Sequence, residues 1–168
     1  MSGAANNKNS LEILDEKIEL LRSTAISMKQ SGKMDETIIE GLLHDVVRHL
    51  YDVYVDENAY VYVPYVSNMP GVLSDEDSVG YVAFTVSENK LPPLHDLQLE
   101  EYRKEKFSDV VDYVYKNIEH LWLCLNPGTY YVFDIYDWNL EYIMARKNGA
   151  ERFPLREEDG TIYGYLTW

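Results

Sequence analysis

The sequence predicts an α+β protein: an N-terminal helical hairpin, then a mixed or antiparallel sheet with helices packed on it. Two patterns support this prediction. Apolar residues recur at spacings of three and four over roughly the first 55 residues, which is typical of amphipathic helices. Short alternating or fully apolar segments follow, separated by turn residues, and these indicate strands.

A chain of 168 residues is long enough for one self-sufficient domain. We expect residues 1–8 to be a disordered tail, because they are small and polar. Residues 9–55 should form the helical hairpin, and residues 56–168 one α+β unit.

The first helix should begin at Asn9, which stands three residues before Glu12 as in a capping box. Gly32 provides the helix stop. One face of this helix carries the apolar residues Leu11, Leu14, Ile18, Leu21, Ala25 and Met28. Either this stripe packs within the chain, covering one side of the sheet, or helix 11–28 pairs with another chain, which would make a homo-oligomer.

A second helix is expected from about Asp35 to Tyr54. Its apolar stripe consists of Ile39, Leu42, Leu43, Val46, Leu50 and Val53. Two helices joined by a few residues usually pack as an antiparallel hairpin.

The strands follow. Residues 59–66 read as a strand covered on both faces, with Pro64 at an end, a bulge or an edge. Residues 68–78 read as a loop, and residues 80–86 as a second strand paired antiparallel with the first. Helical character returns from about Leu99, and a clear amphipathic helix follows with Phe107, Val110, Val111, Val114, Tyr115 and Ile118 on one face.

Leu121–Leu125 is short, apolar and bounded by turn signals, so we predict a central strand. Asn126-Pro127-Gly128 fits a type II turn, because proline presets φ and glycine accepts a positive φ. A strand over 130–133, a helix ending near Arg146 with Leu140, Ile143 and Met144 facing inward, and a hairpin of strands 151–156 and 161–167 complete the expected elements.

Three segments resemble the N-terminal domain of the SseB family, whose name refers to enhanced serine sensitivity and some of whose members are associated with type III secretion. They are Tyr62-Val63-Pro64, the strand that contains Phe84-Thr85, and Leu125-Asn126-Pro127-Gly128. Order and spacing agree over about residues 59–144, including the amphipathic helix. The resemblance implies an α+β interaction domain, and it carries no active site with it.

Charge is unevenly distributed along the chain. The net charge is −14, and residues 35–101 alone contain fourteen acidic and two basic residues, a net −12. This segment repels phosphate backbones and anionic membranes, so we expect neither nucleic-acid nor membrane binding. A single cysteine and the absence of an apolar leader or membrane-length segment predict a cytoplasmic protein.

The residue patterns for catalysis and metal binding are weak, and we predict no catalytic residue, metal or cofactor. Asp45, His49 and Asp52 share one helix face but read as a solvated flank. Asp75-x-Asp77 lacks the glutamate that a calcium loop needs at its twelfth position. Cys124 lies in an apolar strand, where burial raises the pKa of a thiol and makes it inert.

Fifteen tyrosines are the most informative excess in the composition. Tyrosine is enriched at protein interfaces, although it also has a high propensity for β-strands. We predict an acidic–aromatic partner-binding surface made of Tyr60, Tyr62, Tyr65, Asp75, Glu76, Asp77, Tyr81, Tyr130 and Tyr131.

The sequence thus favours a non-catalytic protein–protein interaction domain, SseB-like, whose protein partner is basic. Two alternatives stay open. One is an immunity-type protein that neutralises a basic toxin. The other is a small hydrolase or metal-dependent enzyme whose site forms only in the fold.

Overall fold

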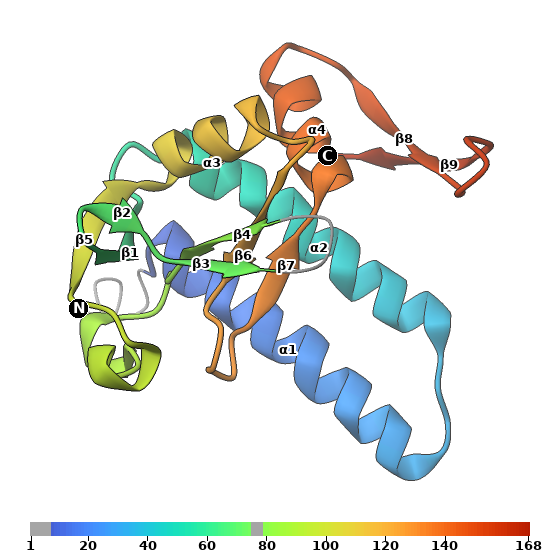
Figure 1. Cartoon of the computed structure of the whole chain (residues 1–168). Coiled ribbons are helices and arrows are strands. Elements are labelled where there is room, and N and C mark those ends of the chain that lie inside the picture. Colours follow the sequence, from blue (N-terminus) through green and yellow to red (C-terminus); the bar gives the residue numbers. More distant parts are fainter. Residues whose placement is uncertain (1–7, 75–78) are drawn as a thin grey trace, which may run out of the picture.

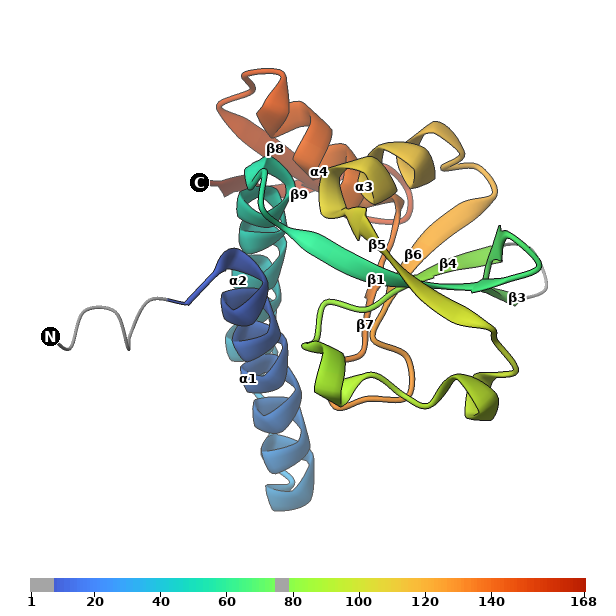
Figure 2. The ribbon, with the colours of Figure 1, turned by 90° about the vertical axis from the view of Figure 1, so that its left-hand side faces the viewer.

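A computed structural model describes residues 8–74 and 79–168. The predicted helical hairpin is present as α1 (Ser10–Ser31) and α2 (Glu36–Val55), and Figure 2 shows it along one side of the strands. The predicted tail, residues 1–8, lies outside the described residues except for Lys8. The α+β fold class is confirmed.

Local chemistry sets the helix ends as predicted. The Asn9 side chain accepts a hydrogen bond from the Glu12 backbone N–H at 2.8 Å, and this caps α1. Gly32 ends α1 at φ 70°, a left-handed conformation that glycine adopts without steric cost. Asp35 caps α2 by accepting from the N–H groups of Thr37 and Ile38.

The apolar stripe of α1 is buried more completely in its N-terminal half than in its C-terminal half. Leu14 and Ile18 are fully buried in the main core, together with residues of the sheet, so the proximal half of the stripe packs within the chain. The distal half is more open, and Ile26 on its flank is 46% exposed. Pairing of helix 11–28 with a second copy stays a prediction.

The strands of the described residues form two larger sheets and one hairpin. The first sheet has the order β2 (Met69–Pro70), β1 (Tyr60–Val66), β5 (Glu101–Lys106). The second has the order β3 (Val72–Ser74), β4 (Val79–Ala83), β6 (Leu121–Leu125), β7 (Phe133–Ile135). The hairpin pairs β8 (Arg152–Arg156) with β9 (Ile162–Thr167).

β6 is the central strand that the sequence predicts. It pairs parallel with β4 and antiparallel with β7, so the second sheet is mixed. The parallel pair brings Gly80 opposite Trp122, and a Cβ on Gly80 would lie 2.6 Å from the Trp122 ring. The glycine is therefore what allows this ring to cover β4.

The predicted antiparallel pairing of β4 with β1 is wrong except at one bridge. Tyr62 and Phe84 exchange backbone hydrogen bonds of 2.9 and 2.8 Å, whereas the ladders of β4 are with β3 and β6. β1 instead pairs antiparallel with β5 over most of its length, from Tyr60 to Tyr65.

Two local predictions are also corrected. Residues 101–106 are strand β5 and not the start of a helix, because pairing with β1 overrides their helix-favouring composition. Residues 72–74, predicted as loop, form the edge strand β3. Between β4 and β5 lie the short 3-10 helices η2 (Glu88–Lys90) and η3 (Leu94–Leu97).

The two faces of β4 and β6 belong to different apolar clusters, as the twofold alternation of a strand requires. Tyr81, Ala83, Leu123 and Leu125 face the main core with the helices. Val82, Phe84 and Cys124 face a second cluster, against which Tyr62 and Tyr131 pack.

The C-terminal half contains α3 (Phe107–Lys116) and α4 (Asp137–Lys147), both close to their predicted positions. Leu140, Ile143 and Met144 are buried, as predicted. The β8–β9 hairpin projects from the body of the protein beyond α4 (Figure 1). Among the described helices, none is both long enough and apolar enough to cross a membrane.

Candidate functional site: the tyrosine cleft

A cleft of about 640 Å³ lies between α1, the start of β1 and the segment after β4. Three of the tyrosines predicted to bind a partner, Tyr60, Tyr62 and Tyr131, line it together. We call it the tyrosine cleft. Its other charged and polar residues used below are Glu12, Asp15, Glu16, Glu19, Thr85, Lys90 and Lys104.

One wall of the tyrosine cleft is acidic. Glu12, Asp15, Glu16 and Glu19 follow one another at spacings of three, one and three, which places all four on one face of a helix. This face adjoins the apolar stripe of α1. Burying Leu14 and Ile18 therefore also sets the direction in which the acidic face points.

The opposite wall is aromatic and carries two lysines. Tyr62 and Lys104 are direct cross-strand neighbours on β1 and β5, and Lys104 Nζ lies 5.7 Å from the centre of the Tyr62 ring. Lys90 Nζ lies 5.2 Å from the centre of the Tyr131 ring. Both distances suit cation–π attraction.

The polar floor of the cleft is held by Asn126, which is fully buried. Its side-chain oxygen accepts from the Thr85 backbone N–H at 2.8 Å. Its amide donates to Thr85 Oγ1 at 2.8 Å and to the Tyr131 carbonyl at 3.0 Å. One asparagine thus joins the end of β4 to the loop that follows β6.

Thr85 connects this floor to the helical hairpin. Its hydroxyl donates to Asp15 Oδ1 at 2.5 Å, so a chain of hydrogen bonds runs from Asn126 through Thr85 to α1. Burial raises the pKa of the Asp15 carboxyl to about 6, although the Thr85 hydrogen bond and Lys90 act in the other direction. Ionisation of the Asp15 carboxyl in this cleft therefore costs free energy.

The predicted type II turn is confirmed. Gly128 has φ 79°, and the Thr129 N–H donates to the Asn126 carbonyl at 3.2 Å. Asn126 itself has φ 56°, a left-handed conformation that asparagine tolerates better than most residues. Turn geometry alone explains Pro127 and Gly128. Asn126 has a second role, because its side chain makes the hydrogen bonds of the floor.

The remaining predicted tyrosines do not join the cleft. Tyr65 and Tyr81 are 9% and 5% exposed, and both hydroxyls donate to the Glu105 carboxylate. They are core residues with little surface for a partner. Tyr130 is 78% exposed, and Arg22 of α1 donates to its carbonyl and lies 5.7 Å from its ring centre.

The predicted acidic contacts Asp75, Glu76 and Asp77 lie outside the described residues. The acids that do face the tyrosines come from α1. Their periodic spacing is visible in the sequence, so a search for acidic helix faces would have found them. No comparable signal links Thr85 to Asn126, because 41 positions separate them.

His49 and Cys124 have structural surroundings. His49 is buried, with Nε2 2.8 Å from the Ser10 carbonyl and Nδ1 3.2 Å from Asp52. Burial, with a smaller effect of Asp134, raises the pKa of the Cys124 thiol to about 12. Within residues 8–74 and 79–168, no three His, Cys, Asp or Glu side chains are grouped to hold a metal ion.

Comparison of the chain with protein-family models, with curated proteins and with solved structures finds no match.

Proposed function

We propose that this chain is a non-catalytic protein-recognition domain, SseB-like in type, and that the tyrosine cleft is its binding surface. One observation carries the proposal. Four acidic side chains of α1 face three tyrosines across a single cleft. Tyrosine gives contact area at low entropic cost, and acids around it select a partner with basic residues.

The exposure of the rim supports recognition of a macromolecule. Tyr60 is 47% exposed at the cleft, and Tyr130, which directly precedes the lining residue Tyr131 without lining the cleft itself, is 78% exposed. Such large exposed aromatic side chains are the type that dominates binding energy when a partner covers them. The hydrogen-bonded floor keeps both walls in a fixed arrangement, which lowers the entropy lost on binding.

The experiment is capture of a partner from the native cells by the immobilised chain. The double variant Tyr60→Ser/Tyr62→Ser should lose at least about tenfold in the amount captured, since truncation of central aromatic contacts costs about 2 kcal/mol or more. The matched control is Tyr113→Ser/Tyr115→Ser, which removes two exposed tyrosines of α3. Equal capture by both double variants would contradict the proposal.

An immunity-type role is a special case of the same proposal, in which the basic partner is a toxin. Its distinguishing feature is genetic. A toxin gene beside the gene for this chain, and a toxin that the Tyr60→Ser/Tyr62→Ser variant fails to neutralise, would identify it.

A second function is favoured by one contact, that of Thr85 with Asp15. A hydroxyl that donates to a carboxylate with a raised pKa is an arrangement that hydrolases use for nucleophile and base. The test is hydrolysis of activated esters. The second function is supported over recognition if the activity of the unaltered chain rises with pH around 6 and is lost in both Asp15→Asn and Thr85→Val.

A further inference from the structure

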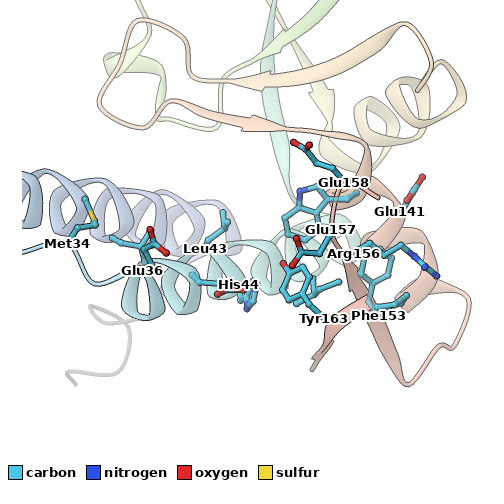
Figure 3. A pocket seen from close by; sticks show the side chains of 15 residues that line it. Met34, Glu36, Leu43, His44, Glu141, Phe153, Arg156, Glu157, Glu158 and Tyr163 are labelled. Carbon is cyan, nitrogen blue, oxygen red and sulfur yellow. Dashed lines mark ion pairs between the residues drawn. The ribbon is translucent and has the colours of Figure 1, made fainter. Parts of the chain in front are cut away.

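A second concave surface lies away from the tyrosine cleft, between α2, α4 and the β8–β9 hairpin. We call it the acidic groove; its volume is about 1000 Å³ (Figure 3). We propose that the acidic groove binds a basic amphipathic helix of a partner protein. The inference is independent of the function proposed for the tyrosine cleft.

The floor of the groove is apolar. It is formed by Ile39, Leu43, Trp138, Phe153 and Leu155. Leu155 is buried, and Leu43, Trp138 and Phe153 pack against the main core while remaining partly open. The floor is therefore a firm, partly solvated apolar surface, of the kind that gains free energy when an apolar side chain covers it.

The rim of the groove is strongly negative. Five glutamates line it: Glu36, Glu40, Glu141, Glu157 and Glu158. Among the described residues that line the groove, Arg156 is the only lysine or arginine, and its guanidinium donates to the Gly160 carbonyl at 2.9 Å. The rim thus has an excess of negative charge that its own residues leave unbalanced.

Two pKa shifts bear on the charge of the groove, one through burial and one through burial and the nearby carboxylates. Burial lowers the pKa of His44, so this side chain is neutral at pH 7 and does not offset the acids. Burial and then the charges of Glu40 and Glu157 raise the pKa of the Tyr163 hydroxyl. Carboxylates from α2 and from the β8–β9 turn therefore act on one point of the groove, from its two sides.

The lining residues of the groove are spread along α2 and toward α4, and several of them are exposed, which suits an elongated partner (Figure 3). Figure 3 shows Met34 and Glu36 toward one end and Glu141 toward the other. Met34 and Tyr163 are 53% and 55% exposed, although both line the groove. A pocket for a small molecule would enclose most of its ligand and place a few polar groups, and not a rim of like charges.

The spacing on α2 favours a helical partner. Glu36 and Glu40 are one helical turn apart, and so are Ile39 and Leu43 beside them. A partner helix alongside α2 would place lysines or arginines at i and i+4 opposite the acids, and large apolar residues at the neighbouring i and i+4 positions opposite the floor. This is the helix-in-groove mode of recognition with charge complementarity added.

The test is titration of the full chain with a designed helical peptide of about 16 residues, roughly four turns, with one leucine face flanked by lysines. The control is a scrambled peptide of equal composition. The designed peptide should bind at least about tenfold more tightly, since a factor of ten is 1.4 kcal/mol and one buried leucine supplies more. Its binding should shift the NMR signals of Ile39, Leu43 and the Trp138 indole.

Charge-reversal variants give the matched comparison. Glu36→Lys/Glu40→Lys should weaken the designed peptide at least tenfold, whereas Asp109→Lys/Glu119→Lys, with the same charge change on exposed positions near α3, should weaken it far less. All four positions are exposed, and NMR spectra of the free variants verify that they fold. Ile39→Ser tests the apolar contact without changing the charge.

Four outcomes would overturn the inference. Equal binding of the scrambled peptide, or equal weakening by both charge reversals, would show attraction to net charge alone. Shifts at Tyr60 and Thr85 in place of the groove would assign the peptide to the tyrosine cleft. Self-association that Glu36→Lys/Glu40→Lys abolishes would show that a second copy of the chain occupies the groove.

Discussion

The tyrosine cleft and the acidic groove are both acidic and aromatic, yet they are built differently. In the cleft, polar side chains form the floor, and Asn126, Thr85 and Asp15 are hydrogen-bonded to one another across three segments. In the groove, the floor is apolar and the acids stand on an exposed rim. The cleft is therefore coupled to folding stability, whereas the groove can be altered with little cost to it.

The first prediction concerns the residue on which the cleft depends most. Asn126→Ala removes three side-chain hydrogen bonds and leaves the buried Thr85 N–H without its acceptor. We expect a loss of about 3 kcal/mol in the free energy of unfolding, measured by denaturant titration. Asn117→Ala, which removes one exposed bond to the Tyr113 carbonyl, should cost less than about 1 kcal/mol.

The second prediction concerns the apolar cluster beneath the cleft. Gly80→Ala places a methyl group 2.6 Å from the Trp122 ring and must displace it. The expected cost is about 2 kcal/mol, with a change in tryptophan fluorescence. Gly164→Ala in β9, whose added Cβ meets no described atom within 4 Å, is the control. Similar losses in both variants would show that strand propensity and not the Trp122 contact is responsible.

The third prediction is a pH dependence of opposite sign for Asp15 in the cleft and for Asp159 in the β8–β9 turn. The pKa of Asp15 rises from 3.8 to about 6 on folding, so the folded state holds the extra proton between these values. Stability should therefore fall as pH rises through this window, and Asp15→Asn should recover about 1 to 2 kcal/mol at pH 7.

Asp159 in the β8–β9 turn provides the opposite case. Hydrogen bonding to Thr161 lowers the pKa of its carboxyl. Its contribution is present above its unfolded pKa and lost as pH falls through its folded pKa, so Asp159→Asn should destabilise the protein at neutral pH. Thermal unfolding of both variants from pH 3 to pH 8 checks the two signs; a flat difference for Asp15→Asn would contradict the buried-carboxylate interpretation.

The smallest effect is expected at the rim of the groove. Met34→Ser removes an apolar side chain that is 53% exposed, so stability should change by no more than about 0.5 kcal/mol. Binding of the designed peptide should nevertheless weaken. A large loss of stability would show that the groove, like the cleft, is part of the folding core.

Periodicity predicted much of the fold but only part of the site. The helical hairpin, β6, α3, α4 and the β8–β9 hairpin follow from local patterns of apolar residues and turn residues. The pairing of β1 with β5 does not, because Glu101–Lys106 becomes a strand only through its partner. Tyrosine content predicts a surface that includes Tyr60, Tyr62 and Tyr131, and these three line one cleft, but their binding role stays a prediction. Tyr65 and Tyr81 are buried, which residue type alone does not reveal.

The hydrogen bonds of the polar floor could not be predicted from the sequence, and the reason is physical. Asn126 has a sufficient local role in the turn, so nothing in its neighbourhood indicates the bonds to Thr85. The parallel pairing of β4 with β6 brings the two strand ends together, and α1 then adds Asp15. Contacts of this kind between distant segments exist only in the folded chain.

Site-specific photo-crosslinking in the native cells tests the central claim most directly. A photoreactive phenylalanine analogue replaces Tyr60 in the cleft or, as the control, Tyr113 on α3, two positions that are 47% and 52% exposed. If the tyrosine cleft recognises a protein partner, the Tyr60 position gives one discrete crosslinked protein and the Tyr113 position does not. Crosslinking of the same protein with equal yield at both positions, or at neither, would contradict the claim.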